Sequence, residues 1–228
     1  MIKEIPILFS TPMVQAILEG RKTQTRRIPI ETISIDKMGN LIMGKWNYGQ
    51  HLDRRPQFEN LISLKSRWKI RDILWVRETW RGIEQDFGPD RIEYKASESI
   101  NIEGKWKPSI HMPKVAARIW LQVESVRVER LQDISEEDAK AEGVRPNCEG
   151  IEKCPSQYCQ RMGCQSTGEY YHYQRDLDDF PAFSAKESFE SLWQSINGVK
   201  SWNENPWVWV ITFKVLSTTG KPDLQSSK

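Results

Sequence analysis

The chain has 228 residues, and its 33 lysines and arginines nearly balance its 31 aspartates and glutamates, which leaves a formal net charge of +2. This balance argues against a polybasic nucleic-acid binder, so any nucleic-acid contact should be local. The sequence lacks both a signal-peptide pattern and an apolar window of the roughly 18 to 20 residues that a membrane span requires. We expect a cytoplasmic protein without membrane contact, long enough for one large domain with a sizeable core.

A short helix is predicted directly after the opening apolar segment. Thr11 is its candidate cap, Pro12 suits its first position, and Gly20 suits a left-handed stop. The residues that follow Gly20 therefore begin in the turn after a helix.

Residues 20–27 read Gly-Arg-Lys-Thr-Gln-Thr-Arg-Arg, which places four cations and two hydroxyls in a short run. β-Branched residues and a period of two favour a strand from Thr23 onward. Lys22 can face Thr25 only if Lys22 still belongs to the preceding turn. The predicted strand has Thr23, Thr25 and Arg27 on one face and Gln24 and Arg26 on the other.

Two interpretations of this run are open. In one, Lys22 lies beside guanidinium groups that lower its pKa toward the range of a general base, and the hydroxyl of Thr25 is activated as a nucleophile. In the other, Lys22, Arg26 and Arg27 form a solvated basic edge that attracts phosphate or nucleic acid. Composition by itself favours the second interpretation.

The middle of the chain is mostly predicted strand. A polar stretch at about 30–60 reads as a long loop or a hairpin. Strands are predicted at 73–80 and 91–95, and the prolines in 107–113 indicate an extended connection. A long strand, 115–128, changes its apolar parity near Glu124 and Ser125, so it should carry a bulge or bend that suits a small barrel.

Two capping boxes predict helices in the second half of the chain. Ser135 begins a short helix that runs to Glu142 before Gly143 ends it. Ser184 begins a second helix, which Gly198 ends. The second helix should bury the face formed by Phe189, Leu192, Trp193 and Ile196.

The chain closes with an alternating strand, predicted at 207–215, and a polar tail at 217–228 that we expect to be disordered. Several separated strands, few helices and a bent strand favour an α+β fold built on a small mixed barrel over a doubly wound sheet. Most of the ten tryptophans should lie in the core, whereas Trp80 and Trp106 are candidates to stack on a base.

All four cysteines lie in one window, at Cys148, Cys154, Cys159 and Cys164. In a chain without a secretion signal, such a cluster favours a structural zinc site with four thiolate ligands over disulfides. Their spacing lacks the Cys-x-x-Cys pairs of most zinc sites, so free thiols are also an open interpretation.

Several passages resemble the ASCH domain, a relative of the PUA fold, and specifically the longer ASCH-like proteins of bacteriophages and prophages. They include Gly-Arg-Lys-Thr-Gln-Thr-Arg-Arg, Leu-Trp-Val-Arg-Glu-Thr-Trp and Lys-Pro-Ser-Ile-His-Met-Pro. The resemblance implies one ASCH-like domain over 1–216, a small β-barrel flanked by helices, with inserts at about 30–60 and 144–182. The matching passages are 6–14, 17–27, 74–80, 107–113, 128–139, 141–143, 189–197 and 205–209.

The resemblance also implies a cleft that holds RNA, a nucleoside or a similar ligand. Some compact ASCH proteins are N4-acetylcytidine amidohydrolases, whose catalytic lysine, threonine and glutamate resemble Lys22, Thr25 and Glu142 here. Such chemistry requires no cofactor. The residues expected to bind the ligand are Arg21, Arg26, Arg27, Glu78 and Trp80.

The candidate glutamate has a physical requirement of its own. A carboxylate in the last turn of a helix opposes the helix dipole, so Glu142 should have a cation nearby unless it is exposed to solvent. Lys22 and Arg27 are the candidate cations.

Other features of the sequence leave alternatives open. Arg71 and Asp72 stand where the family usually has Gly-Asp, which predicts a different turn before the strand at 73–80. Glu78 and Arg77 are expected either to line the cleft or to form an internal ion pair. A non-catalytic RNA-binding module and an interaction protein of phage biology, whose partner the sequence does not name, are alternatives to the hydrolase.

Overall fold

The computed structural model describes residues 2–29, 33–35, 37, 40–43, 46–50, 66–83, 91–97, 105–145 and 184–223. Contacts between residues divide the chain into two compact units. Unit 1 comprises Met1–Thr23, Trp68–Ser125 and Thr212–Lys228, and unit 2 comprises Gln24–Arg67 and Val126–Ile211.

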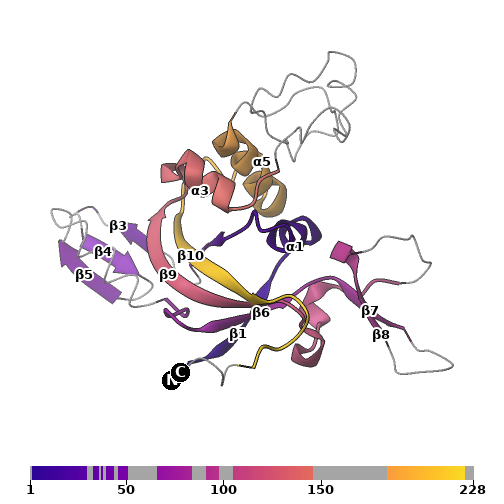
Figure 1. The fold of residues 1–228 in the computed structure, drawn as a ribbon. Helices are drawn as coiled ribbons and strands as arrows, with labels where there is room; N and C mark the ends of the chain where they lie inside the picture. The colour runs from indigo at the N-terminus through magenta and orange to yellow at the C-terminus, as the bar shows by residue number, and fades with distance from the viewer. Residues whose placement is uncertain are drawn as a thin grey trace, which may run out of the picture. The chain divides into compact units, whose positions relative to one another are not determined.

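The largest sheet has five strands in the order β1-β6-β9-β10-β2 (Figure 1). Its end strands are β1 and β2, so the described strands do not close into a barrel. With three helices in the described ranges, this sheet confirms the predicted α+β class. The elements are β1 (Glu4–Leu8), α1 (Thr11–Leu18), β2 (Gln24–Arg27), β6 (Ile73–Arg77), β9 (Trp120–Arg130), α3 (Glu136–Ala141), α5 (Ala185–Asn197) and β10 (Trp207–Ser217).

Unit 1 contains α1 and the strands β1 and β6, which pair in parallel. β6 pairs on its other side with β9 in the antiparallel sense, and Ile73 lies opposite Gln122. Apolar side chains of β6 and of the segment before β9 form a buried cluster. Its members are Ile73, Trp75, Met112, Ala116, Ala117 and Trp120.

Helix α1 begins one residue earlier than the sequence predicts. Its N-cap is Ser10 rather than Thr11, because Ser10 has the extended backbone of a cap (φ −72°, ψ 161°) and its carbonyl accepts the Val14 N–H at 3.0 Å. The side chain of Ser10 makes no cap hydrogen bond. Gly20 has a φ of 76°, which confirms the predicted left-handed stop.

The predicted strand at 73–80 is two strands. β6 ends at Arg77, and Trp80 begins β7 (Trp80–Ile83), which pairs with β8 (Arg91–Tyr94). The single-strand prediction was wrong because the backbone N–H and carbonyl of Trp80 bond to Lys107, at 3.2 and 2.8 Å, instead of extending the ladder of β6.

The segment before β9 forms 3-10 turns. An extended connection was predicted at 107–113 and a strand from 115 onward, and both predictions are wrong for the residues in these turns. One turn spans Ser109–His111 and the other spans Lys114–Ala116. Each follows a proline, and the carbonyls of Pro108 and Pro113 accept the N–H groups that close the turns, at 3.0 and 3.1 Å. Val115, predicted to lie on the buried face of a strand, is 90% exposed.

Unit 2 contains β2, α3 and α5, and the two helices lie side by side (Figure 1). Their facing sides enclose an apolar cluster with the first half of β10. The members of this cluster are Leu131, Ile134, Ala139, Val144, Ala185, Phe189, Leu192, Trp193, Trp202, Val208 and Val210. Ile196 is 51% exposed, so the predicted buried face of α5 ends one turn earlier, at Trp193.

Both predicted capping boxes begin helices. The hydroxyl oxygen of Ser135 accepts the Asp138 N–H at 3.1 Å, and that of Ser184 accepts the Glu187 N–H at 3.1 Å. The predicted stops also hold, because Gly143 and Gly198 have φ values of 85° and 96°. Asn205, in the segment between α5 and β10, also has a positive φ, of 42°.

The long strands follow the predicted patterns only in part. In β9 the buried valines change parity between Val123 and Val128, as predicted, and the border of the two units falls between them. In β10 the predicted alternation is wrong for 208–211, where successive residues are all buried. β10 is an interior strand, and strands covered on both faces lose the alternation.

The polar stretch at 30–60 contains a small antiparallel sheet of three strands, which agrees with the hairpin interpretation. Its strands are β3 (Ile33–Ile35), β4 (Asn40–Met43) and β5 (Trp46–Gln50). Within the described residues, no helix combines the length and the apolar character needed to cross a bilayer.

Candidate functional site

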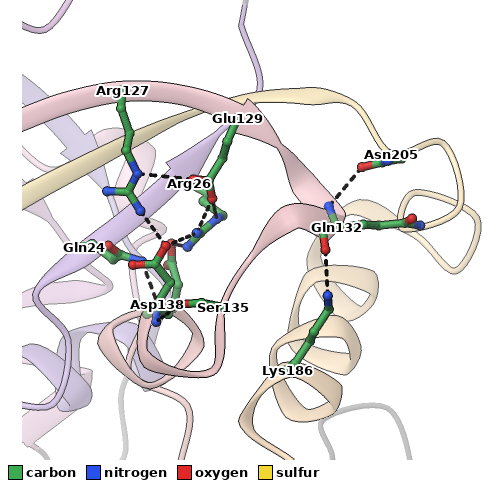
Figure 2. A network of polar contacts seen from close by, with 10 residues as sticks. Gln24, Arg26, Arg127, Glu129, Gln132, Ser135, Asp138, Lys186 and Asn205 are labelled. Atoms are coloured by element: carbon green, nitrogen blue, oxygen red, sulfur yellow. Dashed lines mark hydrogen bonds and ion pairs between the residues drawn. The ribbon is translucent and has the colours of Figure 1, made fainter. Parts of the chain in front are cut away.

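A densely charged site among the described residues of unit 2 surrounds the guanidinium group of Arg26 in β2 (Figure 2). Nη1 of Arg26 lies 3.0 Å from Oε1 of Glu142, at the end of α3. Nη2 lies 3.1 Å from Oδ2 of Asp138, and both Nε and Nη2 bind Oε1 of Glu129 in β9, Nε at 3.1 Å. The side chain of Arg26 is 0% exposed, so three carboxylates replace the water that would otherwise solvate it.

Arg127 is the second cation of this network. Its Nη2 lies 2.5 Å from Oδ2 of Asp138, and its Nε lies 3.2 Å from Oε2 of Glu129. Unlike Arg26, its side chain is 39% exposed. Two cations therefore face three carboxylates, and Glu129 and Asp138 are each shared between both arginines.

Local structure positions these groups. Gln24 and Arg26 both reach Asp138, because Nε2 of Gln24 donates to the Asp138 carbonyl at 2.9 Å. Their common direction confirms the prediction that Gln24 and Arg26 share one face of the strand. The cap at Ser135 fixes the first turn of α3, and with it the backbone that carries Asp138.

The charges shift the pKa values of the network in directions that follow from their surroundings. Burial lowers the pKa of Arg26, but the charges of Glu142, Glu129 and Asp138 outweigh it and raise the pKa above its ordinary value. Burial raises the pKa of Asp138, but Arg127 and Arg26 outweigh that effect and lower it. Burial lowers the pKa of Arg27, which the charge of Glu142 only partly opposes.

The network changes the interpretation of the cationic run. Lys22 is 1% exposed and Arg26 is 4% exposed, so the solvated basic edge is wrong for these two residues. Glu142 is buried at 3% exposed, which excludes the solvent-exposed alternative. Arg26 compensates the negative charge of Glu142, a role for which the sequence indicated Lys22 or Arg27.

The predicted catalytic residues belong to different units. Thr25, 1% exposed, and Glu142 lie in unit 2, on β2 and at the C-cap of α3. Lys22 lies in unit 1, where its N–H donates to the Ala16 carbonyl at 3.0 Å. Lys22 therefore belongs to the turn after α1, which is the position that it needs in order to face Thr25. The Lys22 ammonium lies 5.6 Å from the centroid of the Phe9 ring.

Two other residues predicted to bind a ligand are engaged in ion pairs within unit 1. Arg21 pairs with Glu19 at 2.5 Å, and its side chain is 23% exposed. Glu78 is 1% exposed and pairs with Arg118 through two bonds of 2.9 Å. Glu78 therefore forms an internal ion pair, but its partner is Arg118 and not Arg77. Arg77 instead donates to the Ile110 carbonyl.

The two tryptophans proposed for stacking are partly exposed in unit 1. Trp80 has the Lys107 ammonium 4.9 Å from its ring centroid. Trp106 has the Arg81 guanidinium 4.3 Å from its ring centroid, and Arg81 also pairs with Glu93 at 2.7 Å. Each ring thus already has a cation over it.

The predicted metal ligands lie outside the described residues. They are Cys148, Cys154, Cys159 and Cys164. Within the ranges that the structure describes, no group of three or more histidine, cysteine, aspartate or glutamate side chains is placed to hold a metal ion.

Sequence reasoning missed Arg127, Glu129 and Asp138. A signal was present, because Arg127 and Glu129 are opposite charges two residues apart and so share a strand face. Their common partner, however, lies more than one hundred residues earlier, since Arg26 and Glu129 are separated by 103 positions. Comparisons with protein-family models, with curated proteins and with solved structures found no match to this chain.

Proposed function

We propose that this chain is an ASCH-like domain of the PUA-like barrel type, which binds a nucleoside and hydrolyses the amide of an acylated one, with N4-acetylcytidine as the test substrate. The observation that carries the proposal is the burial of the three candidate catalytic residues. Lys22, Thr25 and Glu142 are 1%, 1% and 3% exposed. Buried titratable residues at positions that match a family's catalytic residues are candidates for a functional site.

The proposed chemistry gives a role to each residue. The hydroxyl of Thr25 attacks the acetyl carbonyl carbon while Lys22, as base, takes the hydroxyl proton. The C–N bond then breaks as the Lys22 ammonium gives this proton to the departing amine of cytidine, which the Glu142 carboxylate orients by accepting its N–H. Water later cleaves the acetyl ester on Thr25. Arg27 steadies the negative charge that develops on the carbonyl oxygen. The pairing of Lys22 with Thr25 rests on their spacing in the chain.

A second observation supports the resemblance to the ASCH family. Arg71 has a φ of 75°, in the left-handed region that favours glycine. The family usually has glycine at the position that Arg71 occupies. A backbone conformation suited to glycine is therefore present where the resemblance expects one.

The carboxylates around Arg26 argue against a phosphate-binding role for this arginine, because phosphate contact needs a cation that is accessible. A non-catalytic RNA-binding module is the second candidate function, and the partly exposed Trp80 and Trp106 favour it. This second function predicts that RNA binding weakens in Trp80→Ala. It also predicts that the protein does not hydrolyse N4-acetylcytidine.

The direct test is to incubate the purified protein with N4-acetylcytidine and to measure the cytidine formed. We expect Lys22→Met, which keeps the length of the buried side chain, to lower the rate by about 100-fold or more. The exposed Lys140→Met is the matched control and should keep the wild-type rate. No cytidine from the wild type, or an undiminished rate in Lys22→Met, would exclude the proposed hydrolase.

A further inference from the structure

Arg26 binds Glu142 directly, at 3.0 Å, and its side chain is not exposed to solvent. From this geometry we infer that Arg26 is a positioning residue, which holds the Glu142 carboxylate in the orientation that accepts the N–H of the departing amine. The inference rests on the proposed hydrolase, in which Glu142 orients the departing amine while Lys22 protonates it.

The guanidinium group is itself fixed from several directions. Each of its three nitrogens binds a carboxylate, and two of these carboxylates, Glu129 and Asp138, come from β9 and α3. The ring of Phe189 in α5 lies 5.5 Å from the Cζ atom of Arg26. A planar group held at its edge and over its face has little freedom to rotate, so the Nη1 that binds Glu142 has a fixed place.

Arg127 shares with Arg26 the compensation of two carboxylates, so the charge of Arg26 also stabilises Glu142. Glu129 and Asp138 each bind Arg127 as well as Arg26. Arg127 therefore carries part of the compensation of these two carboxylates at the more exposed side of the network. Arg26 then stabilises Glu142 at the buried side, where an uncompensated carboxylate would be costly.

The same contacts distinguish a positioning role from direct contact with substrate. All three guanidinium nitrogens of Arg26 already bind carboxylates of this chain, and its side chain is 0% exposed. Stabilisation of charge on the substrate by Arg26 would require these bonds to break. Arg26 therefore acts through Glu142, and its effect should fall on the chemical step rather than on substrate binding.

The test compares Arg26→Lys with Arg127→Lys. Both variants keep a positive charge and lose the planar fork that binds Glu129 and Asp138, but only Arg26→Lys loses the guanidinium bond to Glu142. With N4-acetylcytidine as substrate, we expect Arg26→Lys to lower kcat by at least about tenfold while KM changes less than about twofold. Arg127→Lys should keep kcat within about threefold of the wild type. Equal losses in the two variants, or an unchanged kcat in Arg26→Lys, would overturn the inference.

A second measurement does not depend on catalysis. Urea unfolding of the wild type, Arg26→Lys, Glu142→Gln and the double variant forms a cycle, with folding of each variant checked by circular dichroism. We expect the double variant to lose less stability than the two single variants together. Additive losses would refute the positioning contact itself. A wild type that forms no cytidine, with a non-additive cycle, would instead refute the hydrolase and keep the contact.

Discussion

Arg118 binds Glu78 through two parallel hydrogen bonds, Nε to Oε1 and Nη2 to Oε2, each 2.9 Å long. The Glu78 side chain is 1% exposed, whereas that of Arg118 is 16% exposed. The same guanidinium lies 4.1 Å from the centroid of the Tyr94 ring and donates to the Ser97 hydroxyl at 2.8 Å. Glu78 is thus tied to the part of unit 1 that carries Tyr94 and Ser97.

Removal of the Glu78 charge should therefore destabilise the protein. We expect Glu78→Gln to lower the free energy of unfolding by about 3 kcal/mol, because the mostly buried Arg118 loses its ionic partner. Glu4→Gln is the control, since Glu4 pairs with Lys114 and Lys221, whose side chains are 46% and 57% exposed. That variant should cost less than about 1 kcal/mol. Urea unfolding measures both, and equal costs would contradict the difference in burial.

Asp138 should contribute stability that depends on pH. Although burial alone raises its pKa, the charges of Arg127 and Arg26 lower it below the ordinary value of 3.8. A carboxylate with a lowered pKa stabilises the folded state above its unfolded pKa and loses that contribution as the pH falls through its folded pKa. We expect the stability difference between the wild type and Asp138→Asn to shrink below pH 3.8.

Thermal unfolding between about pH 6 and pH 2 measures this effect. Glu124→Gln provides a control, because Glu124 is an exposed carboxylate of β9. Its stability difference from the wild type should vary little over the same range. A difference for Asp138→Asn that stays constant with pH would show that the two arginines do not favour its ionised form.

The N-caps of α5 and α1 should differ in energy. The hydroxyl of Ser184 accepts the Glu187 N–H, whereas the side chain of Ser10 makes no cap hydrogen bond. We expect Ser184→Ala to cost about 1 kcal/mol of stability and Ser10→Ala to cost a few tenths or less. Urea denaturation of the two variants measures both losses of stability. A larger loss in Ser10→Ala than in Ser184→Ala would contradict this prediction.

Arg71 should tolerate glycine better than a β-branched residue. Its φ of 75° is strained for an L-residue, and its side chain is exposed. We expect Arg71→Gly to change the stability by less than about 0.5 kcal/mol, since relief of strain offsets the entropy of a more flexible unfolded chain. Arg71→Val should cost about 1 to 2 kcal/mol. Equal stabilities of the two variants would contradict the left-handed backbone.

The cysteine window gives a prediction about metal content. If Cys148, Cys154, Cys159 and Cys164 bind zinc as four thiolates, protein purified under reducing conditions without chelator should contain about one zinc per chain. Replacement of Cys159 by Ser should lower that content and the stability together. Zinc-free protein with four titratable thiols would instead establish the free-thiol alternative.

Local patterns in the sequence were sufficient for the ends of helices. Ser135 and Ser184 cap helices as predicted, and Gly20, Gly143 and Gly198 end them with positive φ. A cap depends on a side chain and an N–H group three residues away, so the whole interaction lies within one turn. The same reasoning misplaced the cap of α1 by one residue, because the adjacent Ser10 and Thr11 are both residue types that cap helices.

Strand boundaries required tertiary contacts. The residue pattern at 73–80 is continuous, yet the strand divides because Trp80 pairs with Lys107, a residue distant in sequence. The alternation predicted for β10 fails where both of its faces are buried. Neither outcome follows from the periodicity of one segment, since each depends on what covers that segment.

The sequence by itself determined the cationic run, its position in a turn and strand after a helix, and the pairing of Gln24 and Arg26 on one strand face. Only the tertiary structure decided that Arg26 is buried among carboxylates rather than exposed to phosphate. The physical reason is distance along the chain: Arg26 and Glu142 are 116 positions apart and 3.0 Å apart in space. Burial then makes their pairing necessary, because neither charge is stable without water or an opposite charge.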